Sequence, residues 1–139
     1  IKLLQELDNS IEIELLSNSK KIIFNADKEQ LGRVFFNLIK NSIESIDQKR
    51  ENGHNFEKKI TIELNEFDYQ ISIIIIDNGV GFGVFTNNIK DILNPYITTK
   101  KNGTGLGLSI VNKIINDHNG KIEFFPIKVG AKIEIIFNK

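Results

Sequence analysis

Three glycines at alternate positions, in Gly103-Thr104-Gly105-Leu106-Gly107-Leu108, lead into an apolar run that has helical spacing. Glycine lets a backbone approach a ligand closely and leaves its N–H groups uncovered. The first turn of a helix adds four unpaired N–H groups and a partial positive charge. Two threonines and two lysines, Thr98-Thr99-Lys100-Lys101, stand just upstream. We therefore expect this stretch to form a cradle for a polyphosphate.

The glycine-rich stretch also has a simpler interpretation, because many such loops are plain turns. The chain has no G-x-x-x-x-G-K-[ST] sequence, and its glycines follow G-x-G-x-G rather than G-x-G-x-x-G. The residues before them are polar, unlike the buried strand that precedes a dinucleotide fingerprint. A P-loop and a dinucleotide-binding fold are therefore poor matches, and the rest of the chain must decide what binds here.

Asn37, Asn41 and Glu44 form a second polar group, at positions i, i+4 and i+7 of a predicted helix. This spacing puts them in one stripe beside the apolar face, and three such residues alone are most often a solvated stripe. Two asparagines within the otherwise apolar run 35–41 are an odd choice for solvent, however. An asparagine carbonyl can ligate a hard cation such as Mg²⁺ without adding a charge that repels phosphates.

Asp77 ends the most apolar predicted strand, and Gly79 and Gly81 follow it. Asp, Asn and Gly all favour turns, so a strand-end turn is one interpretation. The other is a carboxylate at the floor of a pocket, which would accept a hydrogen bond from an exocyclic amine while the glycines leave space for a flat ring. A carboxylate for a purine amine, an asparagine for Mg²⁺ and a glycine-rich helix start for phosphates together describe an ATP site.

The hydrophobic pattern predicts the elements that must position these groups. Asp27 followed by Gln30 is typical of a helix N-terminus with a capping box. Strand runs that alternate with single helices favour an α+β fold, a two-layer sandwich with helices on one face of a mixed, mostly antiparallel sheet. We expect strands at 11–15, 21–24 (a hairpin with the first), 60–64, 71–76 (central), 121–125 and 131–137, and helices at 28–50, 85–93 and 104–118.

The last predicted helix should bury one face and end at a defined signal. Its inward residues should be Leu108, Ile110, Val111, Ile114 and Ile115. Asn119-Gly120 is a C-cap signal, and His118 just before it should offset the helix dipole.

Composition limits the classes of function that remain. The 139 residues suffice for one domain, spanning 1–139, with residues 1–7 as the tail of a preceding helix in a longer protein. The formal net charge is zero, which argues against a nucleic-acid partner and gives no sign of a membrane-surface patch. Cysteine is absent, so disulfides and thiolate metal sites are excluded.

These stretches together resemble the catalytic, ATP-binding domain of bacterial sensor histidine kinases, in the GHKL superfamily with gyrase, Hsp90 and MutL. The resemblance covers nearly the whole chain, and its four boxes stand in family order: the N box at 37–45, the G1 box at 77–81, the F-box region at 95–100 and the G2 box at 103–108. The run Pro95-Tyr96-Ile97-Thr98-Thr99-Lys100 and the ending Asp117-His118-Asn119-Gly120 resemble the nitrogen-regulation group, NtrB and especially NtrY. The implied fold is the Bergerat α/β sandwich.

The resemblance also implies roles for individual residues. Asn41 would ligate Mg²⁺, with Asn37 assisting directly or through water, and Asp77 would bind the adenine amine in a pocket shaped by Gly79 and Gly81. A lid containing Thr98, Thr99 and Lys100 would reach the outer phosphates, and Lys100 would act in catalysis with the two asparagines. The remaining implied nucleotide-binding positions are Ser45, Gly103, Thr104, Gly105, Leu106, Gly107 and Leu108.

Asn37 indicates the type of reaction. In hydrolysing relatives a glutamate stands at this position and activates water, whereas an amide cannot act as a general base. Phosphoryl transfer to another group is therefore favoured over a GHKL-type ATPase. A nucleotide-binding regulatory module without activity and an anti-sigma serine kinase remain as alternatives.

The phosphate acceptor is expected outside this chain. Neither His54 nor His118 has the sequence context of a phosphoacceptor histidine. The resemblance implies a histidine on a separate dimerisation domain of the same kinase and a response regulator receiver domain downstream. It also implies a cytoplasmic location within a membrane-anchored sensor kinase.

Overall fold

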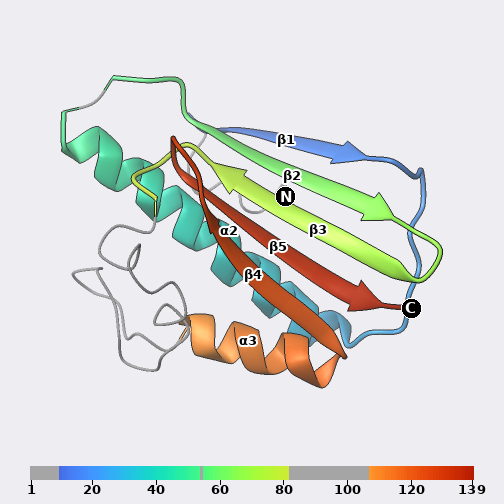
Figure 1. The fold of residues 1–139 in the computed structure, drawn as a ribbon. Helices are drawn as coiled ribbons and strands as arrows, with labels where there is room; N and C mark the ends of the chain where they lie inside the picture. The colour runs from blue at the N-terminus through green and yellow to red at the C-terminus, as the bar shows by residue number, and fades with distance from the viewer. Residues whose placement is uncertain (1–9, 54, 82–106) are drawn as a thin grey trace.

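The computed structural model describes residues 10–53, 55–81 and 107–139, which form a five-stranded sheet with two helices on one face (Figure 1). The strand order is β1-β2-β3-β5-β4; β1 runs parallel to β2, and the other neighbours are antiparallel. This confirms the predicted two-layer α+β sandwich. The elements are β1 (Glu12–Ser17), α2 (Lys28–Glu51), β2 (Lys59–Glu66), β3 (Gln70–Asp77), α3 (Gly107–Asp117), β4 (Gly120–Pro126) and β5 (Ala131–Asn138).

Helix α2 forms as its sequence predicts. The Asp27 side chain accepts a hydrogen bond from the Gln30 N–H at 3.1 Å, which satisfies one of the free donors at the helix start. Lys49 and Arg50 stand in the last turn, where positive charge is favourable. The buried stripe that holds the helix against the sheet consists of Leu31, Val34, Leu38, Ile39, Ser42, Ile43 and Ile46.

Strand β3 is the middle of the five strands, as predicted, and α2 lies across its inner face (Figure 1). Ile71, Ile73 and Ile75 alternate along β3 and are at most 4% exposed, so one face of the strand belongs to the core. Their neighbours on β5 include Phe137 and Ile135, which are fully buried. The sheet thereby fixes the end of β3, where Asp77 lies, against the helix layer.

The predicted hairpin between 11–15 and 21–24 is wrong. Strand β1 pairs in parallel with β2, with Ile13 opposite Ile60, and residues 20–27 form no strand. Ile22 and Phe24 still alternate inward, but they pack against the core from the end of the sheet. The Phe24 and Phe137 ring centroids are 5.2 Å apart. The alternation of apolar residues at 21–24 therefore arises because one side of this segment packs on the core, and not because the segment pairs with a strand.

Helix α3 buries a narrower face than predicted. Val111, Ile114 and Ile115 are buried and Leu108 is half-buried, but Ile110 is 40% exposed, so its predicted inward position is wrong. Position 110 lies on the flank of the stripe that the others form, because successive helical residues are rotated by about 100°.

The end of α3 is closed by the predicted C-cap residues. Asn119 takes the left-handed conformation, with φ of 57°. Gly120 instead begins β4, where a Cβ would stand 2.7 Å from the Phe137 ring. The glycine is thus required by close packing of β4 on the core.

His118 has a different role from the predicted one. Its Nε2 accepts a hydrogen bond from the Asp27 N–H at 3.1 Å, so its Nδ1 carries the proton and donates to the Ile114 carbonyl at 2.8 Å. Both ring nitrogens are therefore used in hydrogen bonds. His118 links the end of α3 to the start of α2.

Several predicted elements lie outside the described residues: the helix tail at 1–7, the short helix at 85–93, and residues 104–106 of the last helix. Within the described residues, no helix is long and apolar enough to cross a membrane.

Candidate functional site

Asp77 lies at the end of β3 and is buried, with 5% of its surface exposed. Its Oδ1 accepts a hydrogen bond from the Gly79 N–H at 2.9 Å, and the buried Ser42 hydroxyl donates to the same carboxyl group. Burial raises the pKa of Asp77 from 3.8 to about 6, although the Gly79 and Ser42 hydrogen bonds and the charge of Lys49 act to lower it. This is a buried, ionisable hydrogen-bond acceptor beside helix α2.

The turn after Asp77 is packed directly on α2. The Val80 N–H donates to both the Oγ and the carbonyl oxygen of Ser45, at 3.0 and 3.3 Å. A Cβ on Gly79 would stand 2.3 Å from Ser45 Oγ and 2.7 Å from the Ile46 backbone nitrogen. Gly79 is therefore needed for the approach of the turn to the helix. The predicted role of Gly79 and Gly81 in leaving space for a ring stays a prediction.

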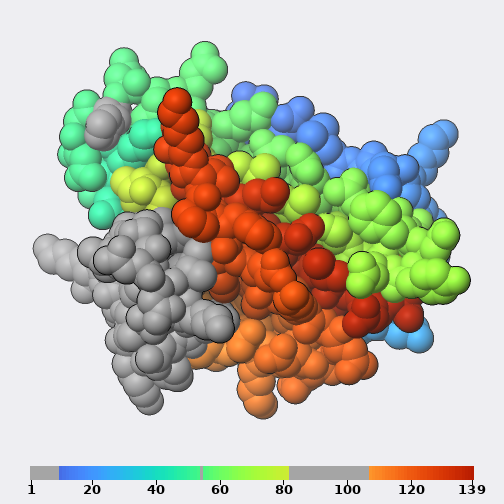
Figure 2. Space-filling view, viewed as in Figure 1, coloured from blue at the N-terminus to red at the C-terminus, as the bar shows by residue number. Residues whose placement is uncertain are grey.

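Gly130 contacts the candidate site, although the sequence predicts only the strands on either side of it. It has φ of +86°, and a Cβ there would stand 1.8 Å from the Asp77 carbonyl oxygen. Gly81 has φ of +81°, and a Cβ there would stand 2.8 Å from the Gly130 oxygen. The tip of the β4–β5 hairpin thus touches the backbone of the turn, as the adjacent surfaces in Figure 2 show. The sequence signal that could have identified Gly130 is its place as a single glycine between two predicted strands.

Asn37 and Asn41 are half-buried on α2, in the same helix that supplies Ser42 and Ser45 to the Asp77 turn. Both asparagines offer neutral amide oxygens, which suit Mg²⁺ held partly by phosphate oxygens. In the part of the chain that the structure describes, no group of three or more His, Cys, Asp or Glu side chains could hold a metal ion by itself.

Only the end of the glycine-rich stretch falls within the described residues. Gly107 is the first residue of α3, and its Cβ position meets nothing within 4 Å in the described part of the chain. Leu108 packs against the core. The predicted residues Thr98, Thr99 and Lys100 and those at 103–106 lie outside the described residues.

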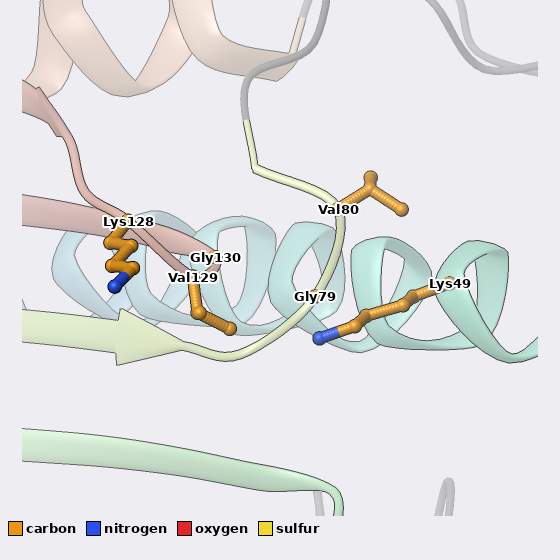
Figure 3. A pocket seen from close by; sticks show the side chains of 6 residues that line it. All are labelled: Lys49, Gly79, Val80, Lys128, Val129 and Gly130. Carbon is orange, nitrogen blue, oxygen red and sulfur yellow. The ribbon is translucent and has the colours of Figure 1, made fainter. Parts of the chain in front are cut away.

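A hollow of about 310 Å³ lies beside the Asp77 turn, between the end of α2 and the β4–β5 hairpin (Figure 3). Among the described residues that line the hollow, Gly79 is the one that the sequence predicts for the nucleotide site. Its lining residues are Lys49, Gly79, Val80, Lys128, Val129 and Gly130.

Comparison with known proteins places these features in a family. The family model described as "Histidine kinase-, DNA gyrase B-, and HSP90-like ATPase" matches residues 26–139. An NtrY-like sensor histidine kinase of Rickettsia conorii is 35% identical over 133 residues, which are 95% of this chain and 21% of that protein. The signal transduction histidine-protein kinase AtoS of Escherichia coli is 34% identical over 138 residues, 98% of this chain and 19% of that protein. The chain thus spans about a fifth of the length of these relatives.

Solved structures show the same architecture. The catalytic domain of histidine kinase ThkA, solved without nucleotide, is 26% identical with a TM-score of 0.80, covering 99% of this chain and 89% of that one. ThkA in complex with the response regulator protein TrrA has a TM-score of 0.75 at 23% identity, covering 99% of this chain and 39% of that one, and shares the fold. The expected kinase-type α/β sandwich is therefore confirmed.

Proposed function

We propose that this chain, which belongs to the family of histidine kinase-, DNA gyrase B- and HSP90-like ATPases, binds Mg·ATP and donates its γ-phosphate to a histidine on a separate domain. The observation that carries the proposal is the buried Asp77 carboxyl group, placed at the end of the central strand and beside the helix that bears Asn37 and Asn41. The similarity to sensor histidine kinases such as AtoS supports a role in two-component signalling.

Asp77 has the chemistry and the position needed to bind adenine. An ionised carboxylate has several acceptor sites, and the Gly79 and Ser42 hydrogen bonds occupy only some of them. A buried acceptor left without a donor is costly, and this penalises ligands that lack an amine at the matching position. The carboxylate would therefore select adenine by its exocyclic amine.

Asn41, with Asn37 assisting, fits the part of a magnesium ligand. A neutral amide oxygen completes the coordination of a cation whose other ligands are phosphate oxygens and water. The bound ion would supply charge neutralisation along the triphosphate. The first turn of α3 at Gly107, with 103–106 before it, would add backbone N–H donors for the same phosphates. Thr98, Thr99 and Lys100 would close over the outer ones.

The amide at Asn37 favours transfer over hydrolysis. It can orient a ligand by hydrogen bonds but cannot take a proton from water. The domain would therefore hold ATP without hydrolysing it efficiently until an acceptor histidine binds. That histidine would belong to the dimerisation domain of the same kinase, on the cytoplasmic side of a membrane-anchored sensor, and a response regulator receiver domain would take the phosphate next.

Nucleotide binding is tested by calorimetry with ADP and ATP, with and without Mg²⁺, on the wild-type chain and on Asp77→Asn. The substitution should abolish binding because the amide presents a donor to the adenine amine, while circular dichroism should show an intact fold. Asn41→Ala should weaken only the Mg²⁺-dependent part of the affinity. Unchanged affinity in Asp77→Asn would refute the adenine role.

Phosphoryl transfer is tested by incubating the chain with γ-labelled ATP and its own histidine-bearing helical hairpin domain. Label on a histidine of that hairpin supports the kinase. Release of inorganic phosphate at the same rate with and without the hairpin would instead identify an ATPase, and bound but unreacted ATP would identify a regulatory module.

A further inference from the structure

Lys49 reaches from the last turns of α2 to the turn that follows β3 (Figure 3). Its Nζ donates a hydrogen bond to the Asn78 carbonyl oxygen at 2.9 Å. The same ammonium lies 4.3 Å from the centroid of the Phe56 ring, within the range of a cation–π contact. Two independent contacts therefore hold a half-buried lysine at one place, unlike a solvated lysine at a helix end.

Asn78, which receives this hydrogen bond, is itself fixed by its side chain. Its Oδ1 accepts from the Lys59 N–H at 3.0 Å, and its Nδ2 donates to the Glu57 carbonyl oxygen. These bonds tie the turn to the start of β2, whereas Lys49 ties it to α2. The residue directly after Asp77 is thus anchored on two sides.

The charge of Lys49 also acts on Asp77. The groups that shift the pKa of Asp77 are its burial, the Gly79 N–H, the Ser42 hydroxyl and Lys49. Lys49 is the one charged member of that set, and it favours the carboxylate form. Because the carboxyl group has a pKa of about 6, a change in nearby charge alters how much of it is ionised near neutral pH.

We propose that Lys49 is a positioning residue of the nucleotide site, which anchors the turn after β3 and keeps the Asp77 side chain in the anionic form that accepts the adenine amine. This inference rests on the proposed function. Lys49 would act through Asn78 and Asp77 and would contact neither phosphate nor base.

The direct test is a titration of the nucleotide-free chain. The ¹³C shift of the Asp77 carboxyl carbon is followed against pH by NMR in wild type, Lys49→Met, Lys49→Arg and the control Lys113→Met, an exposed lysine on α3. We expect Lys49→Met to move the midpoint upward, Lys49→Arg to restore it, and Lys113→Met to leave it unchanged. Curves that overlay for wild type and Lys49→Met would overturn the proposal.

The second measurement is the ADP affinity of the same four proteins between pH 5.5 and 8.5. An upward shift of the midpoint predicts that Lys49→Met binds ADP more weakly than wild type near pH 6, with the loss shrinking toward pH 8.5. No loss at any pH would overturn the role of Lys49 in binding, and an equal loss at every pH would overturn its effect through the charge of Asp77. The titration needs no nucleotide, and Asp77→Asn reports on the adenine role separately, so failure of this inference is distinguishable from failure of the proposed function.

Discussion

The two ends of the central strand β3 are built in different ways. At the Asp77 end, a buried carboxyl group is surrounded by backbone that has no room for a side chain at Gly79 or Gly130. At the Gln70 end, the turn to β2 is closed by a hydrogen bond from the Phe67 N–H to the Gln70 oxygen at 2.8 Å, and Tyr69 is 83% exposed. The Asp77 end is therefore sterically restricted, whereas the Gln70 end carries an exposed side chain.

The two ends show where this fold contains a destabilising group: the buried carboxyl group of Asp77, at the proposed nucleotide site. An ionisable group at the buried end opposes folding when it is charged, and close backbone contacts hold it in place. The exposed end has no such group to hold and carries large apolar side chains in solvent, Phe67 and Tyr69. Substitutions should therefore have effects of very different size, and of different sign, at the two ends.

The largest effect is expected for Gly130→Ala. The new Cβ would stand 1.8 Å from the Asp77 carbonyl oxygen, and φ of +86° disfavours any side chain, so the hairpin tip must move away from the turn. We expect a loss of about 4 kcal/mol or more in the free energy of unfolding, measured with urea. Gly53→Ala is the matched control, with φ of +89° and no atom of the described residues within 4 Å of the new Cβ, and should cost about 1 kcal/mol. Equal losses would remove the distinction between the two turns.

Asp77→Asn should stabilise the nucleotide-free chain while abolishing nucleotide binding. The folded pKa of about 6 lies above the ordinary value of 3.8, so the stability contribution of Asp77 is fully present below pH 3.8 and is lost as pH rises through 6. The shift corresponds to up to about 3 kcal/mol above pH 7. Urea unfolding of both proteins at pH 4 and pH 7.5 measures it. A stability difference between the two proteins that does not grow with pH would contradict the cost of burying this charge.

His118→Ala tests the link between the two helices at the Gln70 end. It removes the acceptor of the Asp27 N–H and the donor to the Ile114 carbonyl. We expect a loss of about 1–2 kcal/mol by urea unfolding, with ADP affinity unchanged. Asn116→Ala, at an exposed position on the same helix, should change stability by less than about 0.5 kcal/mol. A loss of affinity would show that this end also shapes the site.

Gly107→Ala tests whether Gly107 is needed for nucleotide binding and not for packing. Its Cβ position meets nothing within 4 Å in the described part of the chain, and alanine favours a helix, so stability should rise by about 0.5–1 kcal/mol. Nucleotide affinity should nevertheless fall, because the methyl group would crowd the phosphates. Gly32→Ala on α2, also with nothing within 4 Å, should stabilise similarly without any effect on affinity. Equal affinity in both variants would remove Gly107 from the site.

Tyr69→Ala should have the smallest effect. The side chain is 83% exposed, and its backbone oxygen, which accepts from the Lys139 N–H, is kept. We expect a change of less than about 0.5 kcal/mol by urea unfolding. Ile71→Ala, two residues further on and 1% exposed, should cost about 2–5 kcal/mol. A large effect at Tyr69 would mean that the exposed end is not tolerant.

Local patterns allowed most of the fold to be predicted. The cap at Asp27 and the 3.6-residue stripe of α2 are contained in residues 27–51, and the structure reproduces them closely. The β4–β5 hairpin around Gly130 is equally local. The segment 21–24 failed because the partner of β1 is β2, which follows the whole of α2, and such pairing leaves no mark in the nearby sequence.

The candidate site was predictable in residue type and less so in geometry. Asp77 was recognised from its place after an apolar strand, but its pKa depends on Ser42 and Lys49, which lie far away in the sequence. The role of Lys49 was not predictable, because its contact with Asn78 exists only in the folded chain. Gly79 was assigned to a ligand, although Ser45 and Ile46 already account for the missing side chain.

The position of Asp77 in the sheet joins site formation to folding. Strands β2 and β3 form one local hairpin, β4 and β5 form another, and Asp77 pairs with Ile60 in the first and with Ala131 in the second. The carboxyl group therefore sits on the seam where the two hairpins meet, a long-range step that forms slowly because a large loop must close. Until β3 pairs with β5, neither hairpin contains the proposed adenine-binding site. Loss of nucleotide affinity and cooperative unfolding would then both follow separation of the two hairpins. Bound nucleotide would therefore protect the backbone amides of both hairpins together against hydrogen exchange.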